Sequence, residues 1–279
     1  MDERQWRSTL TMNARCRKVP MVDSPFALRW PPSEAADVPA HLYGLSTTRR
    51  SGLSAPPYAS LNLGDHVGDD PRRVEANRQR LADLLPPDVE APSFRWLHQV
   101  HGTDVIDAAD HHKSKPTADG AFTTKAGIAC TILTADCLPI LFWNRQGSAV
   151  AAAHAGWRGL ADGIIEATID AMPSPPSSLC AWLGPAIGPD AFEVGADVLH
   201  AFTTSDPGAT AFFSSSPSPD DQPRWLADLP GLATRRLKRL GLHAIFQGSR
   251  CTFSHPRDFF SYRRDGTTGR MATAIWIHP

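Results

Sequence analysis

The sequence has little excess charge of either sign, since 28 Lys and Arg residues stand against 29 Asp and Glu residues, for a formal net charge of -1. A chain without a basic field has no long-range attraction for nucleic acid, so nucleic acid is not an expected partner. The sequence also has no apolar run approaching the roughly 18 residues that a membrane-spanning helix needs, and we expect no membrane partner. Small-molecule substrates fit this composition better.

Cysteine is scarce and irregularly placed. The five cysteines are an odd number, are widely scattered, and follow no secretory apolar region, because residues 1–20 are polar and charged. This pattern favours reduced thiols and a cytoplasmic location. The G-x-S-x-G, G-x-x-x-x-G-K-[ST] and H-E-x-x-H signatures are also missing, so any chemistry must come from another arrangement of residues.

The composition and the alternation of elements indicate the fold class. With 279 residues, 42% of them hydrophobic, the chain can bury one full core. Residues 1–38 are charged and Pro-rich without a sustained period, and we interpret them as an irregular N-terminal extension before a catalytic domain at 39–279. Helices and strands alternate, yet several strands are joined as hairpins. We therefore predict an α+β fold with a layered, mixed β-sheet core flanked by helices, in a single domain.

Periodicity and capping residues give the individual elements. Helices are expected at 71–85, after the capping Asp70, at 160–172, at 196–202 and at 229–240. Strands are expected at 41–48, 94–97, 105–106, 128–133, 179–183, 243–247 and 271–278. We expect the β-branched run 128–133 to pair with the central hairpin described next.

The central hairpin consists of two apolar runs, 138–143 and 148–153, separated by a turn centred on Gln146. That turn places Leu138 opposite His154, and hence Cys137 within one residue of register with His154. Cross-strand neighbours have Cβ atoms roughly 4.5–5.5 Å apart. A thiolate and an imidazole at that spacing can share a metal ion, or can act as a nucleophile and its base.

A purely structural interpretation of this pair is also available, with Cys137 as a small buried hydrophobe and His154 as a satisfied histidine at a strand end. The polar neighbours Asp136 and Arg158 at the same end of the hairpin favour a functional site. A metal ion needs a third ligand, and His101 is the natural candidate because it follows a short strand in a Gly-bounded loop.

Three protein ligands with an open fourth position are typical of catalytic zinc. Bound zinc lowers the pKa of its water to roughly 7 or polarises a substrate group. Copper is chemically possible, but a blue-copper site would need a weak axial ligand such as Met, and these loops contain none. The residues therefore favour Zn²⁺ over Cu²⁺.

Several residues could bind an anion or a substrate at this site. A guanidinium fork suits phosphate or carboxylate, and the free N–H groups of a helix that starts after Gly156 favour anions. A turn asparagine in S-L-N-L-G can be structural or can contact a ligand. The candidates are Arg49, Arg158, Arg263, Arg264 and Asn62.

Long stretches of the sequence resemble one known family. The stretches are S-L-N-L-G-D-H-V-G-D-D-P at 60–71, Q-V-H-G at 99–102, T-A-D-C-L-P-I at 134–140, H-A-G-W-R-G at 154–159, L-G-P-A-I-G at 183–188 and F-F-S-Y-R-R-D-G-x-T-G-R at 259–270. Together they closely resemble the family once called multicopper polyphenol oxidoreductases, or laccase-domain proteins. Its members are now described as purine nucleoside phosphorylases or, in some bacteria, as a peptidoglycan editing factor. The resemblance runs from about His41 to residue 279.

The resemblance implies a metal centre formed by His101, Cys137 and His154, the same three residues that the chemistry suggests. It implies a cytoplasmic zinc enzyme that phosphorolyses adenosine, inosine and methylthioadenosine to the base and (methylthio)ribose 1-phosphate, with adenosine deaminase activity. Nucleoside and phosphate would be its partners, and the oligomeric state stays open. Asp136 is the candidate for handling protons, and Arg49, Asn62, Arg158 and Arg263 for binding substrate or phosphate.

Two other functions stay in competition. One is the family's older label, a copper-dependent polyphenol oxidase. The other is a metal-free Cys-His amidase that edits a cell-wall precursor, with Cys137 as the nucleophile. One departure from the family pattern is Ser51, where a paired glycine usually follows the arginine. It affects the expected conformation of the loop near Arg49.

Overall fold

The structure is a computed structural model that describes residues 27–28, 38–87, 89–110, 115–217, 223–248 and 250–279. Most of the predicted extension at 1–38 lies outside these residues. Its described part includes strand β1 (Ala27–Leu28), which pairs antiparallel with β2 (Leu42–Thr47).

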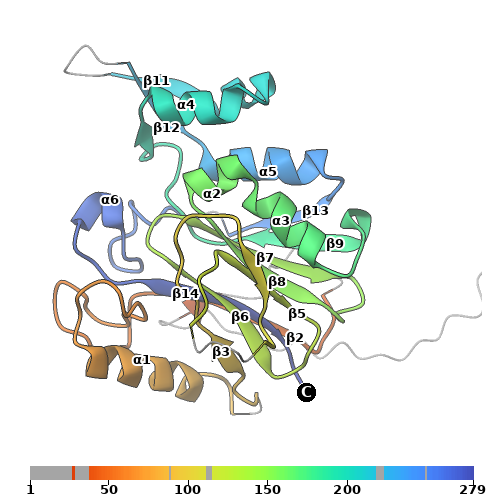
Figure 1. The fold of residues 1–279 in the computed structure, drawn as a ribbon. Helices are drawn as coiled ribbons and strands as arrows, with labels where there is room; N and C mark the ends of the chain where they lie inside the picture. The colour runs from red at the N-terminus through yellow and green to blue at the C-terminus, as the bar shows by residue number, and fades with distance from the viewer. Residues whose placement is uncertain (1–26, 29–37, 88, 111–114, 218–222, 249) are drawn as a thin grey trace, which may run out of the picture.

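Two mixed β-sheets form the core, as predicted for the α+β class (Figure 1). The first sheet has the order β1-β2-β14-β6-β3 and the second has the order β13-β9-β7-β8-β5-β4. The pairs β3–β6, β4–β5 and β13–β9 are parallel, and the other pairs of the two sheets are antiparallel. The strands not yet given are β3 (Ser93–Arg95), β4 (Val105–Asp107), β5 (Gly120–Thr123), β6 (Ile128–Thr134), β7 (Leu138–Asn144), β8 (Val150–Ala155), β9 (Leu179–Leu183), β13 (Ala244–Gln247) and β14 (Met271–Ile277).

The predicted hairpin is present as β7 and β8, but its register differs by one residue from the prediction. Pro139, not Leu138, lies opposite His154. The turn is centred between Gln146 and Gly147, because Gly147 adopts a left-handed conformation with φ 73°. The Asn144 side-chain oxygen completes the turn by accepting the N–H of Ser148 at 2.8 Å.

The prediction that residues 128–133 pair with this hairpin is wrong. Strand β6 pairs with β14 and β3 in the first sheet, whereas the hairpin belongs to the second sheet. Residues 135–137 carry the chain from one sheet to the other, and Asp136 turns the chain there with φ 99°. The link is short, so the ends of β6 and β7 lie close together.

Side chains alternate along the strands, so that one set fills the space between the two sheets and the other set packs on their outer faces. Cys130 and Ile132 of β6 pack with Leu141 and Trp143 of β7 between the sheets. Leu138, Ile140 and Phe142 face the other way, towards the helices. The molecule is thus built in layers, with helices outside two facing sheets (Figure 1).

Two of the helices begin at capping residues that the sequence indicates. In α1 (Pro71–Asp83) the Asp70 carboxylate accepts the N–H of Arg72, and in α5 (Leu229–Arg239) the Asp228 carboxylate accepts the N–H of Gly231. The single helix expected at 160–172 is instead two, α2 (Trp157–Asp162) and α3 (Ile164–Ala171), separated by Gly163 at φ 108°. Further helices are α4 (Ala196–Thr203), α6 (Tyr262–Asp265) and the 3-10 turns η1 (Pro176–Ser178) and η2 (Pro207–Phe212).

A small third sheet with the order β10-β12-β11 lies near α4, away from the two large sheets (Figure 1). Its strands are β10 (Glu193–Val194), β11 (Phe213–Ser216) and β12 (Arg224–Ala227). Within the described segments, none of the helices has the length and apolar composition needed to cross a bilayer.

Candidate metal centre

Three side chains from separate elements meet where the chain passes from one large sheet to the other. Cys137 follows the crossover from β6 to β7, His154 lies near the end of β8, and His101 lies in the loop between β3 and β4. The Cys137 Sγ is 3.7 Å from the His101 Nε2, and one ligand atom from each of the three residues lies within 4.8 Å of the others. We predicted this convergence from the sequence, although His101 is distant in the chain from Cys137 and His154.

Two glycines of the H-A-G-W-R-G stretch allow this approach. A Cβ on Gly156 would lie 2.8 Å from His101 Cδ2 and 3.1 Å from Cys137 Sγ. A Cβ on Gly159 would lie 2.8 Å from the carbonyl oxygen of Gly102. Any other residue at these positions would push the His101 loop away from Cys137 and His154.

The buried carboxylate of Asp119 organises both histidines. Its Oδ1 accepts the His154 Nδ1–H at 2.7 Å and the backbone N–H of His101 at 2.9 Å. Its Oδ2 accepts the backbone N–H groups of Val100 and Gly102 at 3.0 and 2.8 Å. A carboxylate only accepts hydrogen bonds, so Nδ1 of His154 carries the proton and its Nε2 stays available as a ligand. The Asp119 carboxylate thus also holds the loop that bears His101, in which His101 itself has a φ of 62°.

Charges within the cluster shift its pKa values in the metal-free protein. Burial raises the pKa of Cys137, but the charge of His154 and the hydrogen bond with His101 outweigh it and lower this pKa to about 6. Burial lowers the pKa of His154, whereas Cys137 and Asp119 raise it, to about 9 overall. Burial opposes ionisation of Asp119, yet its hydrogen bond with His154 holds the pKa of this carboxyl below its ordinary value. A thiolate beside an imidazolium results.

The three residues fit a metal ion in donor chemistry and in spacing. Zinc–sulfur and zinc–nitrogen bonds of roughly 2.3 and 2.0–2.1 Å place two tetrahedral ligand atoms about 3.5 Å apart. The 3.7 Å between Cys137 Sγ and His101 Nε2 is close to that value. The His154 ring is held by a carboxylate, as ligating histidines commonly are. His101 is exposed, so the cluster is open to solvent on one side.

Asp136 is buried next to Cys137, and its carboxylate has protein partners. Its Oδ1 accepts the Thr252 hydroxyl at 2.6 Å, and its Oδ2 accepts the Ser261 hydroxyl at 3.0 Å and the N–H of Arg263 at 2.7 Å. Asp136 therefore attaches the crossover to the loop of residues 252–263. Its predicted role in proton handling stays a prediction.

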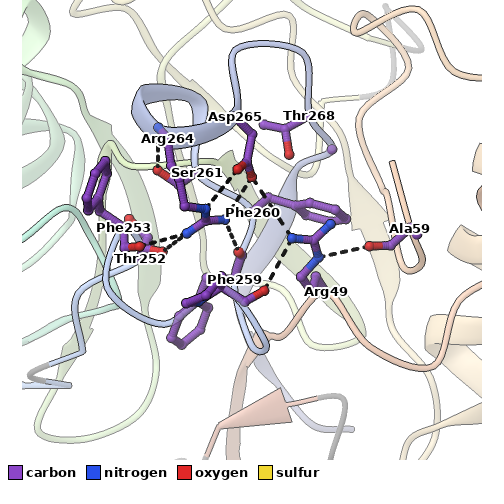
Figure 2. A network of polar contacts seen from close by, with 12 residues as sticks. Arg49, Ala59, Thr252, Phe253, Phe259, Phe260, Ser261, Arg264, Asp265 and Thr268 are labelled. Atoms are coloured by element: carbon purple, nitrogen blue, oxygen red, sulfur yellow. Dashed lines mark hydrogen bonds and ion pairs between the residues drawn. The ribbon is translucent and has the colours of Figure 1, made fainter. Parts of the chain in front are cut away.

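The Arg49 side chain is engaged by backbone carbonyls and a carboxylate (Figure 2). Its Nε donates to the Ala59 carbonyl at 2.8 Å, and one terminal nitrogen lies 4.0 Å from Asp265. Asp265 also pairs with Arg264, so this one carboxylate lies between two guanidinium groups (Figure 2). The Arg49 guanidinium is also stacked on Phe260, 4.6 Å from the ring centre.

The other predicted anion- and substrate-binding residues have different surroundings. The exposed Arg158 lies over the ring of its neighbour Trp157 at 4.4 Å, on a helix of only 6 residues. Arg263 donates to the carbonyl of Glu193 at 2.6 Å. Asn62 is fully buried, and its Nδ2 donates to the Asp69 carboxylate at 2.9 Å. Within the described residues, no hydrogen bond or ion pair joins these side chains to one another, and their binding roles stay predictions.

Two residues that the sequence did not single out lie at the centre. The one signal for Asp119 was that an acidic residue stands directly before strand β5. Arg270 ends the F-F-S-Y-R-R-D-G-x-T-G-R stretch and directly precedes β14, and the charges of Cys137 and Asp136 act on its guanidinium. The one feature of the sequence that pointed to Arg270 was its place in that stretch.

The fold and the His101, Cys137 and His154 centre together define a two-sheet α+β protein with a candidate metal site of three ligands. The family described as multi-copper polyphenol oxidoreductase laccase matches residues 44–278, and the chain belongs to this family. The purine nucleoside phosphorylase YfiH of Shigella flexneri is 47% identical over 251 residues, which cover 89% of this chain and 97% of that protein. The purine nucleoside phosphorylase PA4543 of Pseudomonas aeruginosa is 48% identical over 239 residues, covering 86% of this chain and 95% of the relative.

Solved structures agree with the fold. Protein NMB0706 of Neisseria meningitidis superimposes with a TM-score of 0.83 at 45% identity, covering 92% of this chain and 100% of that one. YlmD of Geobacillus stearothermophilus superimposes with a TM-score of 0.79 at 33% identity, covering 91% of this chain and 97% of that one. The predicted family and fold class are confirmed.

Proposed function

We propose that this protein is a zinc-dependent purine nucleoside phosphorylase that also deaminates adenosine. The observation that carries the proposal is the convergence of His101, Cys137 and His154 on one open point, with His154 oriented by Asp119. Relatives named purine nucleoside phosphorylases, which this chain matches over most of its length, support the substrate class. Adenosine, inosine and methylthioadenosine are the proposed nucleosides.

The proposed reaction needs no oxidant. An oxygen of phosphate forms a bond to C1′ of the ribose while the bond from C1′ to the purine nitrogen breaks. The electron pair stays on the base, and the base takes the proton that phosphate gives up. The products are the free base and ribose 1-phosphate. Deamination exchanges the 6-amino group of adenosine for the oxygen of water and releases ammonia, so it consumes no phosphate.

The residues of the chain would divide the work. His101, Cys137 and His154 would hold the metal ion, and Asp119 would hold the Nδ1–H of His154, so that its Nε2 is the atom that binds the ion. When bound, the ion supplies a Lewis acid at the open position. Arginines would bind phosphate, among which Arg158 is exposed and therefore accessible. A reducing compartment, the cytoplasm, suits a site that needs the Cys137 thiolate.

The test measures inosine cleavage and adenosine deamination with and without inorganic phosphate. Inosine cleavage should need phosphate and release ribose 1-phosphate, whereas deamination should proceed without it. Cys137→Ala protein, purified identically, is the control for a contaminating phosphorylase of the expression host, and it should lack both activities. Equal cleavage of inosine without phosphate, with free ribose as product, would replace phosphorolysis by hydrolysis.

Two specific observations support competing functions. The family description names a polyphenol oxidoreductase, which supports a copper oxidase. The lowered pKa of Cys137 beside His154 supports a metal-free thiol nucleophile acting on an amide. Metal analysis of freshly purified, tag-free protein discriminates among the three. Stoichiometric zinc supports the phosphorylase, copper the oxidase, and absence of metal the amidase.

A further inference from the structure

The strand register brings Arg270 next to the metal centre. Met271 of β14 pairs with Thr134 of β6 in an antiparallel ladder. The next residues outward on the two strands are Arg270 and Ala135, so Arg270 borders the crossover that bears Cys137. The charges of Cys137 and Asp136 act on the Arg270 guanidinium, which agrees with this position.

The backbone and the stem of Arg270 are fixed by the S-L-N-L-G stretch. The Asn62 Oδ1 accepts the N–H of Arg270 at 2.9 Å, and the carbonyl of Arg270 accepts the N–H of Leu63 at 3.1 Å. The side chain runs over Gly64, where an added Cβ would lie 2.7 Å from Arg270 Cγ. Buried Asn62 thus positions this arginine, and Gly64 leaves the space that its side chain occupies.

The charge of Arg270 lacks a close anionic partner in the described part of the chain. One terminal nitrogen donates to the carbonyls of Thr268 and Gly269, both at 3.0 Å, and no ion pair involves it there. Arg49 and Arg264, in contrast, each pair with Asp265. Burial lowers the pKa of Arg270, which reflects the cost of removing a cation from water. A half-buried guanidinium with spare donors is suited to an anion from outside.

The potential around Arg270 is positive on a second side. Burial lowers the pKa of His66, and the charges of Arg270 and Lys115 lower it further. Asp65 compensates part of this charge, because it pairs with Lys115 and lies 3.6 Å from an Arg78 nitrogen. Lys115 and Arg78 therefore share one carboxylate close to His66 and Arg270, and an added anion would be stabilised there.

We propose that Arg270 binds the phosphate co-substrate at the metal centre, with Asn62 as the residue that positions it. This inference rests on the proposed phosphorolysis for its ligand. Phosphate offers several oxygens that can accept two parallel N–H bonds of one guanidinium, an arrangement that a lysine cannot reproduce. The same oxyanion chemistry would serve the 5′-phosphate of a nucleotide, so the experiment separates the two sources.

The experiment compares Arg270→Met and Arg270→Lys with wild-type protein and with Arg145→Met. Arg145 is exposed in the β7–β8 turn, at the end of the hairpin opposite to the metal ligands, and is the matched control. Arg270→Met should raise the KM for phosphate in inosine cleavage roughly 10- to 100-fold, the loss expected for charge-assisted hydrogen bonds. Arg270→Lys should show a smaller rise and keeps a cation if the methionine variant folds poorly. Metal content should change less than about 2-fold in both Arg270 variants, and in Arg145→Met both the metal content and phosphate-free adenosine deamination should stay within about 2-fold of wild type.

A second readout needs no turnover. Equilibrium dialysis with radiolabelled inorganic phosphate should show binding to wild-type and Arg145→Met protein and weaker binding to Arg270→Met. If wild-type protein binds phosphate in this Arg270-dependent way but cleaves no inosine, the proposed function fails and the anion site stands. If inosine cleavage needs phosphate but its KM is unchanged in Arg270→Met, the assignment of Arg270 is overturned and the function stands. Tighter binding of adenosine 5′-monophosphate than of inorganic phosphate would assign the site to a nucleotide instead and also overturn the proposal.

Discussion

Replacing Asp119 by Asn tests how far one carboxylate organises the metal centre. The asparagine has almost the same shape but keeps only one of the two acceptor oxygens. Each oxygen of Asp119 accepts two N–H groups, so the variant loses two hydrogen bonds and turns an NH₂ group towards donors. At about 1.5–3 kcal/mol for each bond to a charged group, the loss is about 3–6 kcal/mol of unfolding free energy.

The metal affinity should fall as well, because the His154 ring loses the partner that fixes its tautomer. Loss of such a partner typically costs about 10- to 100-fold in metal affinity. Urea denaturation of the metal-free protein measures the first effect, and competition for zinc with a chromogenic chelator measures the second. Asp104→Asn is the matched control, since Asp104 is an exposed residue of the loop that bears His101. Wild-type zinc affinity and wild-type stability in Asp119→Asn would refute the role we derive for this carboxylate.

Other predictions concern the ligands and their surroundings. His101→Ala, Cys137→Ala and His154→Ala should each lose stoichiometric zinc while keeping the circular-dichroism spectrum of the fold, and retained zinc in one variant removes that residue from the site. Gly156→Ala should lower zinc affinity, because its Cβ would lie 2.8 Å from His101 Cδ2; unchanged affinity would mean that the loop yields freely. Cys130→Ser and Cys180→Ser, both within strands, should lose some stability but bind zinc normally; zinc loss without unfolding would implicate another thiol. In metal-free protein, alkylation of Cys137 should rise with pH through about 6, because its pKa is lowered, and peptide mapping that finds a midpoint near 9 would contradict this.

The same pKa shifts predict how the stability of the metal-free protein depends on pH. The lowered pKa of Cys137 contributes stability that is present above its unfolded value of about 8.5 and is lost as the pH falls through about 6. The raised pKa of His154 contributes stability that is present below its unfolded value of about 6.5 and is lost as the pH rises through about 9. The pair should therefore stabilise the protein most between about pH 6 and about pH 9. Cys137→Ala should flatten the dependence of the unfolding free energy on pH, as measured by urea denaturation.

The sequence predicted the convergence of His101, Cys137 and His154 better than the surroundings of these residues. Cys137 and His154 were predictable because one hairpin joins them, and even a register error of one residue left them close. His101 was found by its chemistry, since a third ligand was needed and its loop had the right flanks. Asp119 gave almost no local signal, because its four hydrogen-bond donors come from segments distant in the chain or from a loop whose shape depends on it.

The pairing of the strands was less predictable from local pattern. The apolar run of β6 has the composition of a buried strand, but composition does not specify its partner. Nearness in the chain favoured the hairpin, yet the left-handed Asp136 directs the chain into the other sheet. The arginines were similarly ambiguous, since Arg49, Arg263 and Arg270 all lie in polar stretches. The sequence does not show what each guanidinium contacts. Those contacts distinguish Arg49 and Arg263, which are held by the protein, from Arg270, which has spare donors.

The position of β14 has a consequence for the order of events during synthesis. This strand lies between β2 and β6, although it is made long after both of them. Until residues 261–277 have been added, the strand that joins β2 to β6 is missing, and so are Arg270 and the Ser261 hydroxyl that donates to Asp136. His101, Cys137 and His154 then leave the ribosome well before the residues that surround them have been synthesised. Productive metal capture should therefore follow translation of β14, and a chain stalled before Met271 should be a substrate for chaperones and proteases.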